Sequence, residues 1–347
     1  MKSLLYKIIK VRELSIIVLM VAYFLFVGSI NSQFTEIDSI VLIVNGSIIL
    51  LIMAIGQSFV LLTSNIDVSV GSIMGLSAAV CGTLLASGVN LGIVIFSVIC
   101  VGAVIGVING VGVSYLKIPA IIMTLGMLGI VRGLMLLYTK GMWIENIPNY
   151  YKKIARIEII SVPLPVWIGV FLVVISYLFL SKTKFGRYFY AVGDNADGAQ
   201  LVGLPVNVVK VLAFMFSGIS AAIASLIFVM NIGFVPNQTG SGIELQVIAA
   251  AVLGGVGLTG GIGSVVGAGL GAIFFTVINS SLVFMKIPAY WNSAISGLLL
   301  ILIVVGDSSF QKYLKERSNK NAKDSFYKKN SLEEAEAKHE EQTKVVV

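Results

Sequence analysis

The 347-residue chain has a net charge of +7, and 57% of its residues are hydrophobic whereas only 12% are charged. A water-soluble domain carries about 25% charged residues, so half that share excludes a soluble globular protein of this length. The positive charge does not indicate nucleic-acid binding, because Lys and Arg stand in short clusters beside apolar runs, as membrane anchors do. These clusters lie at 2–12, 182–187 and 312–317.

The apolar runs predict an all-α, polytopic membrane protein. A spanning helix needs about 20 apolar residues, and we expect about ten such helices. The predicted spans are 14–31, 39–62, 69–88, 91–115, 119–138, 163–181, 207–230, 244–258, 264–285 and 291–306. Polar or glycine residues interrupt the third and the eighth, which predicts that either is broken or re-entrant.

The basic loops set the predicted orientation, with a cytoplasmic N-terminus at 1–13, a transmembrane domain at 14–307 and a polar tail at 308–347. The external loop 140–162 carries four basic residues and disagrees in part with the positive-inside rule. The tail is dominated by Lys, Glu, Asn and Ser, a composition that cannot bury a core and predicts disorder.

A short motif occurs twice. Lys-Ile-Pro-Ala stands at 117–120 before the fifth predicted span and at 286–289 before the tenth. In the predicted topology the two copies lie on opposite faces of the membrane, as two five-helix halves of inverted topology would place them. The match covers only four residues, so a chance repetition is the alternative to an internal repeat.

The sequence contains no motif that indicates an enzyme active site. Cys81 and Cys100 lie within apolar runs at a spacing that fits no metal or redox motif. His339 is the only histidine and lies in the polar tail, so we expect no metal site. The G-x-G-x-x-G at 255–260 lacks the preceding strand of a nucleotide site, and no P-loop motif exists. We expect this chain to bind no cofactor.

A polar segment at 63–72 separates the second and third predicted spans and contains Asn65, Asp67 and Ser69. Asp67 or Ser69 can cap the helix that follows. Three interpretations are open: a capped helix start, a broken helix that lines a translocation path, and a proton-coupling carboxylate.

Arg132 lies inside the fifth predicted span, where a charge must face a cavity, a partner or the interface. Snorkelling to the outer surface and lining the path are both open. Other polar residues within the spans are candidates for the path by their chemistry alone: Asn109, Thr124, Ser217, Asn279 and Ser280.

The longest predicted cytoplasmic connection is 182–206. It is basic and aromatic at its start, favours a short helix at 196–202 and is closed by Gly203 and Pro205. A helix of this kind docks into another protein or lies on the membrane surface, and the pattern alone does not distinguish these roles.

Two stretches in order resemble the membrane subunits of bacterial sugar-type ABC importers. The first is I-D-V-S-V-G-S at 66–72, and the second is F-G-R at 185–187 followed by Ala191, Gly193 and Asn195. The resemblance extends from about residue 15 to 307. Stretches at 65–70, 143–148, 232–240 and 287–292 are most similar to the permeases of autoinducer-2 importers, although permeases for ribose and other pentoses share the core motifs.

The resemblance implies a non-catalytic permease in a bacterial inner membrane that imports autoinducer-2 or a related sugar-like solute. It also implies three partners: a second permease subunit in a heterodimer, an ATPase subunit that binds ATP and Mg, and an extracytoplasmic solute-binding protein. The residues implied to contact the ATPase are Phe185, Gly186, Arg187, Tyr190, Gly193, Asn195, Leu201 and Gly203. Those expected to dock the binding protein are Trp143, Glu145, Pro236, Asn237 and Gln238.

An ion-coupled secondary transporter is the main alternative. Such a protein usually shows an intramembrane acid–base pair, and only Asp67 and Arg132 are available to form one. Uptake that persists without an ATPase partner would favour this alternative.

Overall fold

The computed structural model describes residues 12–288 and, beyond them, residues 291, 294, 295, 297, 298, 301, 302 and 305. The chain divides into two units, Met1–Leu300 and Ile301–Val347, and every element named below belongs to the first. The predicted tail, most of the N-terminal segment and part of the tenth predicted span lie outside the described residues.

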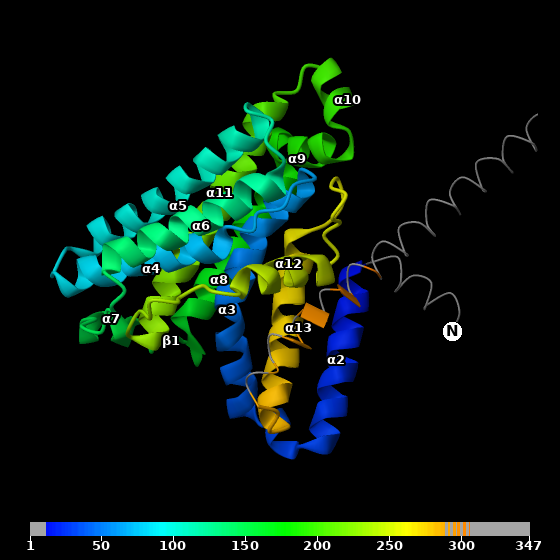
Figure 1. The fold of residues 1–347 in the computed structure, drawn as a ribbon. Coiled ribbons are helices and arrows are strands. Elements are labelled where there is room, and N and C mark those ends of the chain that lie inside the picture. The colour runs from blue at the N-terminus through cyan, green and yellow to red at the C-terminus, as the bar shows by residue number, and fades with distance from the viewer. Residues whose placement is uncertain are drawn as a thin grey trace, which may run out of the picture. The chain divides into compact units, whose positions relative to one another are not determined.

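The described chain is almost entirely helical (Figure 1). Its α-helices are α2 (Arg12–Ile30), α3 (Ile37–Leu62), α4 (Val70–Ala86), α5 (Leu91–Ser114), α6 (Ala120–Thr139), α7 (Asn149–Ile154), α8 (Leu164–Lys182), α9 (Lys184–Asp194), α10 (Ala196–Leu201), α11 (Val206–Ile232), α12 (Ile243–Leu253) and α13 (Val265–Phe284). A 3-10 helix, η1 (Ser32–Thr35), follows α2, and strands β1 (Glu158–Ile159) and β2 (Val162–Pro163) pair antiparallel.

Seven helices of the described chain are long and apolar enough to cross a membrane, namely α2, α3, α5, α6, α8, α11 and α13. The shorter apolar helices α4 and α12 have 17 and 11 residues. They occupy the third and eighth predicted spans, where polar and glycine residues interrupt the apolar runs. The predicted polytopic membrane class is therefore confirmed, whereas the predicted number of about ten spans is not.

The long helices expose apolar side chains that a water-soluble fold would bury. Phe96 on α5, Leu137 on α6 and Phe171 on α8 are each more than half exposed. In a lipid bilayer these side chains meet hydrocarbon, because each helix satisfies its own backbone hydrogen bonds and needs no water. The exposed apolar surface of these helices therefore indicates that they face lipid.

Helix α11 is central and packs against α3, α4 and α5. Its contact with α5 is close because glycines face each other: a Cβ added to Gly102 would collide with the Gly218 carbonyl, and the reverse collision also occurs. Small residues at such crossings let membrane helices approach closely. Helix α13 packs in turn against α3, α12 and α2.

The two ends of α11 carry different structures (Figure 1). Helices α9 and α10 lie at its first residue, and α7 lies near its last. With 27 residues, α11 is about 40 Å long at 1.5 Å per residue, which is enough to cross a bilayer. We call these two sides of the protein the α9 end and the α7 end.

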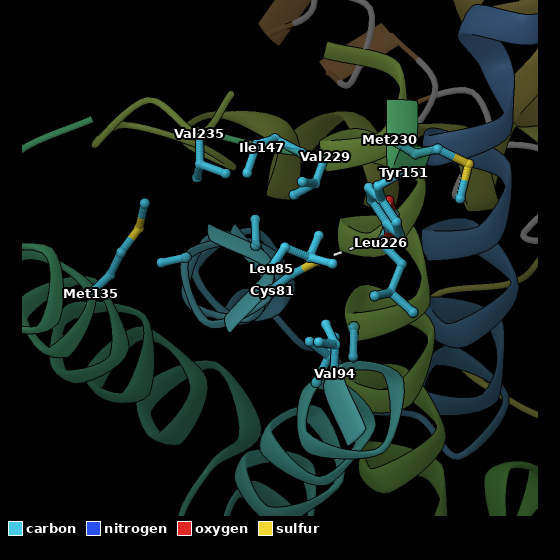
Figure 2. Packing of buried hydrophobic residues seen from close by; sticks show 14 residues of the cluster. Cys81, Leu85, Val94, Met135, Ile147, Tyr151, Leu226, Val229, Met230 and Val235 are labelled. Atoms are coloured by element: carbon cyan, nitrogen blue, oxygen red, sulfur yellow. Dashed lines mark hydrogen bonds between the residues drawn. The ribbon is translucent and has the colours of Figure 1, made fainter. Parts of the chain in front are cut away.

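A buried apolar cluster closes the α7 end (Figure 2). It joins Cys81 and Leu85 of α4, Val94 of α5, and Val229 of α11 to Tyr151 of α7. The Tyr151 hydroxyl donates to the Leu226 carbonyl at 2.9 Å. Elements α7, β1 and β2 were not predicted within loop 140–162, and Tyr151 shows how the first of them is anchored.

Candidate functional site

The polar segment 63–69 turns back into the helix bundle. Helix α3 ends at Leu62 and α4 begins at Val70. Between them, Asp67 reaches Ser217, which lies about 16 Å along the roughly 40 Å of α11 at 1.5 Å per residue. The chain therefore returns from the α9 end to mid-depth before α4 starts, and the predicted broken or re-entrant third span agrees with this path.

Four predicted path residues meet at this point, and all four are buried. Asp67 Oδ1 accepts hydrogen bonds from the Ser69 backbone N–H at 2.9 Å and the Ser69 hydroxyl at 2.6 Å. Ser217 Oγ donates to Asp67 Oδ2 at 2.9 Å, and Asn109 Nδ2 donates to Ser69 Oγ at 2.8 Å. We call Asp67, Ser69, Asn109 and Ser217 the polar network.

Two further residues support the polar network. The Gln57 side-chain amide, oriented to satisfy its hydrogen bonds, pairs with the Asp67 backbone N–H and carbonyl at 3.2 Å each. Thr124 Oγ1 donates to the Ala120 carbonyl at 2.8 Å and lies 3.4 Å from the Ile66 carbonyl. Thr124 was predicted, whereas Gln57 was missed, although an amide within an apolar helix is a usable signal.

The first turns of α4 and α12 meet at this depth. A Cβ on Gly71 would collide with the Gly240 carbonyl oxygen and with Glu244 Oε2. Helix N-termini carry partial positive charge, so the two would repel each other, and an acidic residue at each start offsets that charge. Asp67 offsets the positive charge at the start of α4, and Glu244 offsets that at the start of α12. Glu244 was not predicted, and its Oε2 is buried without a hydrogen-bond partner among the described residues.

Arg132 fixes the loop that enters this region from the α7 end. Its Nη1 donates to the Thr239 carbonyl at 2.9 Å, and Thr239 is buried. The same carbonyl oxygen faces Gly75 of α4 so closely that a Cβ there would collide with it. Arg132 is therefore bonded to another segment of the protein, and its place on a translocation path stays a prediction.

The remaining predicted path residues lie elsewhere. Asn65 donates to the Thr63 carbonyl at 2.7 Å and stays within its own turn. Asn279 and Ser280 lie near the end of α13, where Asn31 Nδ2 donates to the Phe284 carbonyl at 3.0 Å. These three residues take no part in the polar network.

The predicted ATPase-contacting loop is two helices, α9 and α10. Thr183 caps α9 by accepting from the Gly186 backbone N–H at 2.9 Å, and a Cβ on Gly186 would collide with the Phe179 carbonyl of α8. Phe189 is buried between Phe59, Phe179 and Phe216, and its ring lies 5.4 Å from that of Phe59. Helix α9 is thus packed on the ends of α3 and α8 and on the first half of α11.

Helix α10 buries Ala199 and exposes Asp197, Gln200 and Leu201. Asn195 caps it by accepting from the Gly198 backbone N–H at 2.8 Å. At its end, Leu201 is 89% and Val202 76% exposed, and Gly203 closes the turn with φ +82°. Arg187 on α9 is also exposed.

Tyr190 joins α9 to the start of α13. Its hydroxyl donates to the Gly263 carbonyl at 3.2 Å. Burial raises the pKa of this phenol above its ordinary value, and the negative charge of Glu13 adds to the effect. Tyr190 therefore stays a neutral donor.

Two loops pair at the α7 end and hold most of the predicted docking residues. Ile144 and Val235 exchange backbone hydrogen bonds at 3.1 and 2.9 Å, and Trp143 stacks on Phe234 at 5.8 Å. Asn237 Nδ2 donates to the Gly141 carbonyl at 2.9 Å. The predicted docking set lies on this loop pair, with Trp143, Glu145 and Gln238 exposed and Pro236 and Asn237 partly buried.

Among the described residues, no group of three or more Cys, Asp, Glu or His side chains could hold a metal ion. The polar network offers one carboxylate, hydroxyls and an amide, and no described basic side chain donates to Asp67. These four side chains are buried and bond to one another.

Residues 39–304 match the family of permease components of branched-chain amino acid transport systems. The autoinducer 2 import system permease protein LsrC of Salmonella typhi is 41% identical over 334 residues, 96% of each chain. The corresponding protein of Photorhabdus luminescens is 43% identical over 89% of this chain and 94% of its own, and that of Escherichia coli is 43% identical over 85% and 86%. No solved structure matches. The chain belongs to this family of permease components and is a multi-pass inner-membrane protein.

Proposed function

We propose that this chain is the membrane-spanning permease subunit of an ATP-driven importer for autoinducer 2. Relatives with that cargo in their names share 41–44% identity over 85–96% of this chain. The mutual contacts of the polar network and the absence of any P-loop motif fit a subunit that moves a solute with energy supplied by a partner. ATP and Mg then belong to a separate ATPase subunit.

The proposed contact with the ATPase is the α9–α10 pair. Leu201 and Val202 expose apolar side chains beyond the first residue of α11, outside any helix that could span a membrane. Exposed apolar side chains beside charged ones, here Arg187 and Asp197, are typical of a protein-docking surface. This assignment puts the α9 end in the cytoplasm.

The proposed contact with a solute-binding protein is the loop pair at the α7 end. Trp143 is 55% exposed while stacked on Phe234, so it is an aromatic anchor held in place before binding. Lys140, Lys153 and Arg156 are exposed nearby and favour an acidic partner surface. We expect a second, related permease subunit to complete the membrane part as a heterodimer.

Two halves of inverted topology account for the packing. Helix α3 packs on α12 and α13, and α11 packs in the same way on α4 and α5. The repeated Lys-Ile-Pro motif also has a repeated conformation, because Lys117 and Lys286 both have left-handed φ values, 55° and 59°. These observations support a pairing of α3 with α11, α4 with α12 and α5 with α13, in which the starts of the short helices α4 and α12 lie at the centre.

The observation that carries the proposal is that α9 is fixed on the end of α3, directly before the re-entrant segment. Gly261 N–H donates to the Leu62 carbonyl at 3.1 Å, and a Cβ on Gly193 would collide with the same carbonyl. A force applied to α9 by an ATPase therefore acts at the entrance of the polar network.

The test is uptake of labelled autoinducer 2 into vesicles that contain this chain, its permease partner, the ATPase and the binding protein. We expect uptake to require ATP and to be inhibited by excess unlabelled autoinducer 2 but not by ribose. Uptake without ATP or without the ATPase would support an ion-coupled transporter instead. Uptake of labelled ribose but not of labelled autoinducer 2 would assign a pentose as the cargo.

A further inference from the structure

Ser64 lies where three distant segments meet. Its Oγ is 2.8 Å from the Gly193 carbonyl at the end of α9 and 2.6 Å from the Thr259 carbonyl in the loop after α12. A hydroxyl group has one proton and donates it to one acceptor at a time. The Ser64 hydroxyl therefore alternates between the two carbonyl oxygens. Ser64 lies within the predicted polar segment 63–72 but is not among its candidate path residues.

The backbone of Ser64 has a left-handed φ of 59°, a conformation that glycine adopts without strain and other residues rarely adopt. A glycine would satisfy the backbone at this position. The serine therefore contributes its hydroxyl, which is the only part of the side chain that can bond to the other two segments.

The three segments are in close contact at this junction, although Ser64 itself is exposed. A Cβ on Gly260 would collide with Ser64 Oγ, and a Cβ on Gly193 would collide with the Leu62 carbonyl. Gly261 N–H also donates to that carbonyl at 3.1 Å. The end of α9, the end of α3 and the loop 257–263 are therefore close enough that a displacement of one moves the other two.

Two residues separate Ser64 from Asp67, whose carboxylate is bonded to Ser69, the residue before α4, and to Ser217 of α11. We propose that Ser64 is a positioning residue that transmits movement of α9 to the polar network, and so couples ATP hydrolysis to opening between α4 and α12. This inference rests on the proposed function, since it requires an ATPase that moves α9. Ser64 itself contacts neither ATP nor the network.

The experiment compares variants of the full importer in vesicles, measuring autoinducer 2 taken up per ATP hydrolysed. Ser64→Gly removes the hydroxyl and suits the backbone conformation, whereas Ser64→Asn tolerates that conformation and restores a donor. Ser161→Gly is the matched control, because Ser161 has a φ of 57° in the β1–β2 turn at the other end of the protein.

We expect Ser64→Gly to lower uptake per ATP by about tenfold, within the usual range of coupling between sites, while ATP hydrolysis continues at the parental rate. Ser64→Asn should recover most of the loss, and Ser161→Gly should match the parent. An unchanged ratio in Ser64→Gly, or an equal fall in hydrolysis and uptake, would overturn the inference. Absence of ATP-driven uptake in the parent would instead overturn the proposed function.

Discussion

At the residue scale, Asp67 is a buried carboxylate that accepts its side-chain hydrogen bonds from neutral groups: the Ser69 N–H and hydroxyl and the Ser217 hydroxyl. A buried carboxylate is costly unless its lone pairs are satisfied. Here the start of α4 adds the favourable field of a helix N-terminus. Asp67 is thus the group that fixes α4 to α11 at mid-depth.

Replacing Asp67 with Asn tests this role. The amide nitrogen of Asn cannot accept a hydrogen bond, so at least one serine donor loses its acceptor. We expect Asp67→Asn to destabilise the protein by about 1–3 kcal/mol, seen as a lower melting temperature in detergent. Asp38→Asn, at an exposed position in the first turn of α3, is the control. Equal melting temperatures for both variants and the parent would contradict a structural role for the carboxylate.

Arg132 gives a second prediction at this scale. Arg132→Met keeps a long side chain but removes the donor to the Thr239 carbonyl. Because this bond helps to hold the loop 236–242 against α4, we expect backbone amide hydrogen exchange in that loop to become faster. Arg156→Met, an exposed change in the neighbouring loop, should leave exchange there unaltered. Identical exchange in both variants would show that the contacts of Gly75 and Gly240 suffice.

The sequence identifies the members of the polar network but not their partners. Asp67, Ser69, Asn109 and Ser217 can be selected because polar groups within apolar runs are unusual. The bond from Ser217 to Asp67, however, joins residues 150 positions apart, and no local pattern encodes it. Asn279 has the same polar character and lies elsewhere, so residue type alone cannot define the site.

At the element scale, apolar periodicity predicts helix positions well and their interruptions less well. The first nine predicted spans begin and end within two residues of observed helices, except that the eighth ends at Leu253 rather than 258. Glycines at 254 and 255 end α12 early, and Gly255 has a φ of +84°. Hydropathy counts glycine as neutral, so the turn was included in the span. Helix α9 has only 11 residues and includes Lys184, Arg187 and Asp194, so a search for long apolar runs cannot find it.

Gly193 carries a prediction that concerns the packing of α9. Even a methyl group at this position would collide with the Leu62 carbonyl, so Gly193→Ala must move α9 away from α3. We expect ATP-driven uptake to fall about tenfold or more, as for a loss of coupling between sites, with normal membrane insertion. Gly133→Ala on α6 is the matched control, since no atom lies within 4 Å of a Cβ there. Normal uptake by Gly193→Ala would show that the close packing of α9 on α3 is not required for transport.

At the scale of the whole molecule, every inference about partners depends on the α9 and α7 ends lying on opposite faces of the membrane. Helix α11 joins them, with Pro205 before its first residue and Gly233 after its last. Its 27 residues span about 40 Å at 1.5 Å per residue, more than the bilayer core of about 30 Å. The positive-inside rule favours a cytoplasmic α9 end, although the basic residues of loop 140–162 oppose it.

Labelling of single cysteines by a membrane-impermeant maleimide decides between these orientations. Arg187→Cys on α9 and Trp143→Cys at the other end place a thiol on exposed positions, and the parent, whose Cys81 is buried and Cys100 partly so, gives the background. We expect Trp143→Cys to react in intact cells and Arg187→Cys to react only after the membrane is permeabilised. If Arg187→Cys reacts in intact cells, an ATPase in the cytoplasm cannot reach α9. Docking of the ATPase at α9 and the coupling role of Ser64 would then both be wrong.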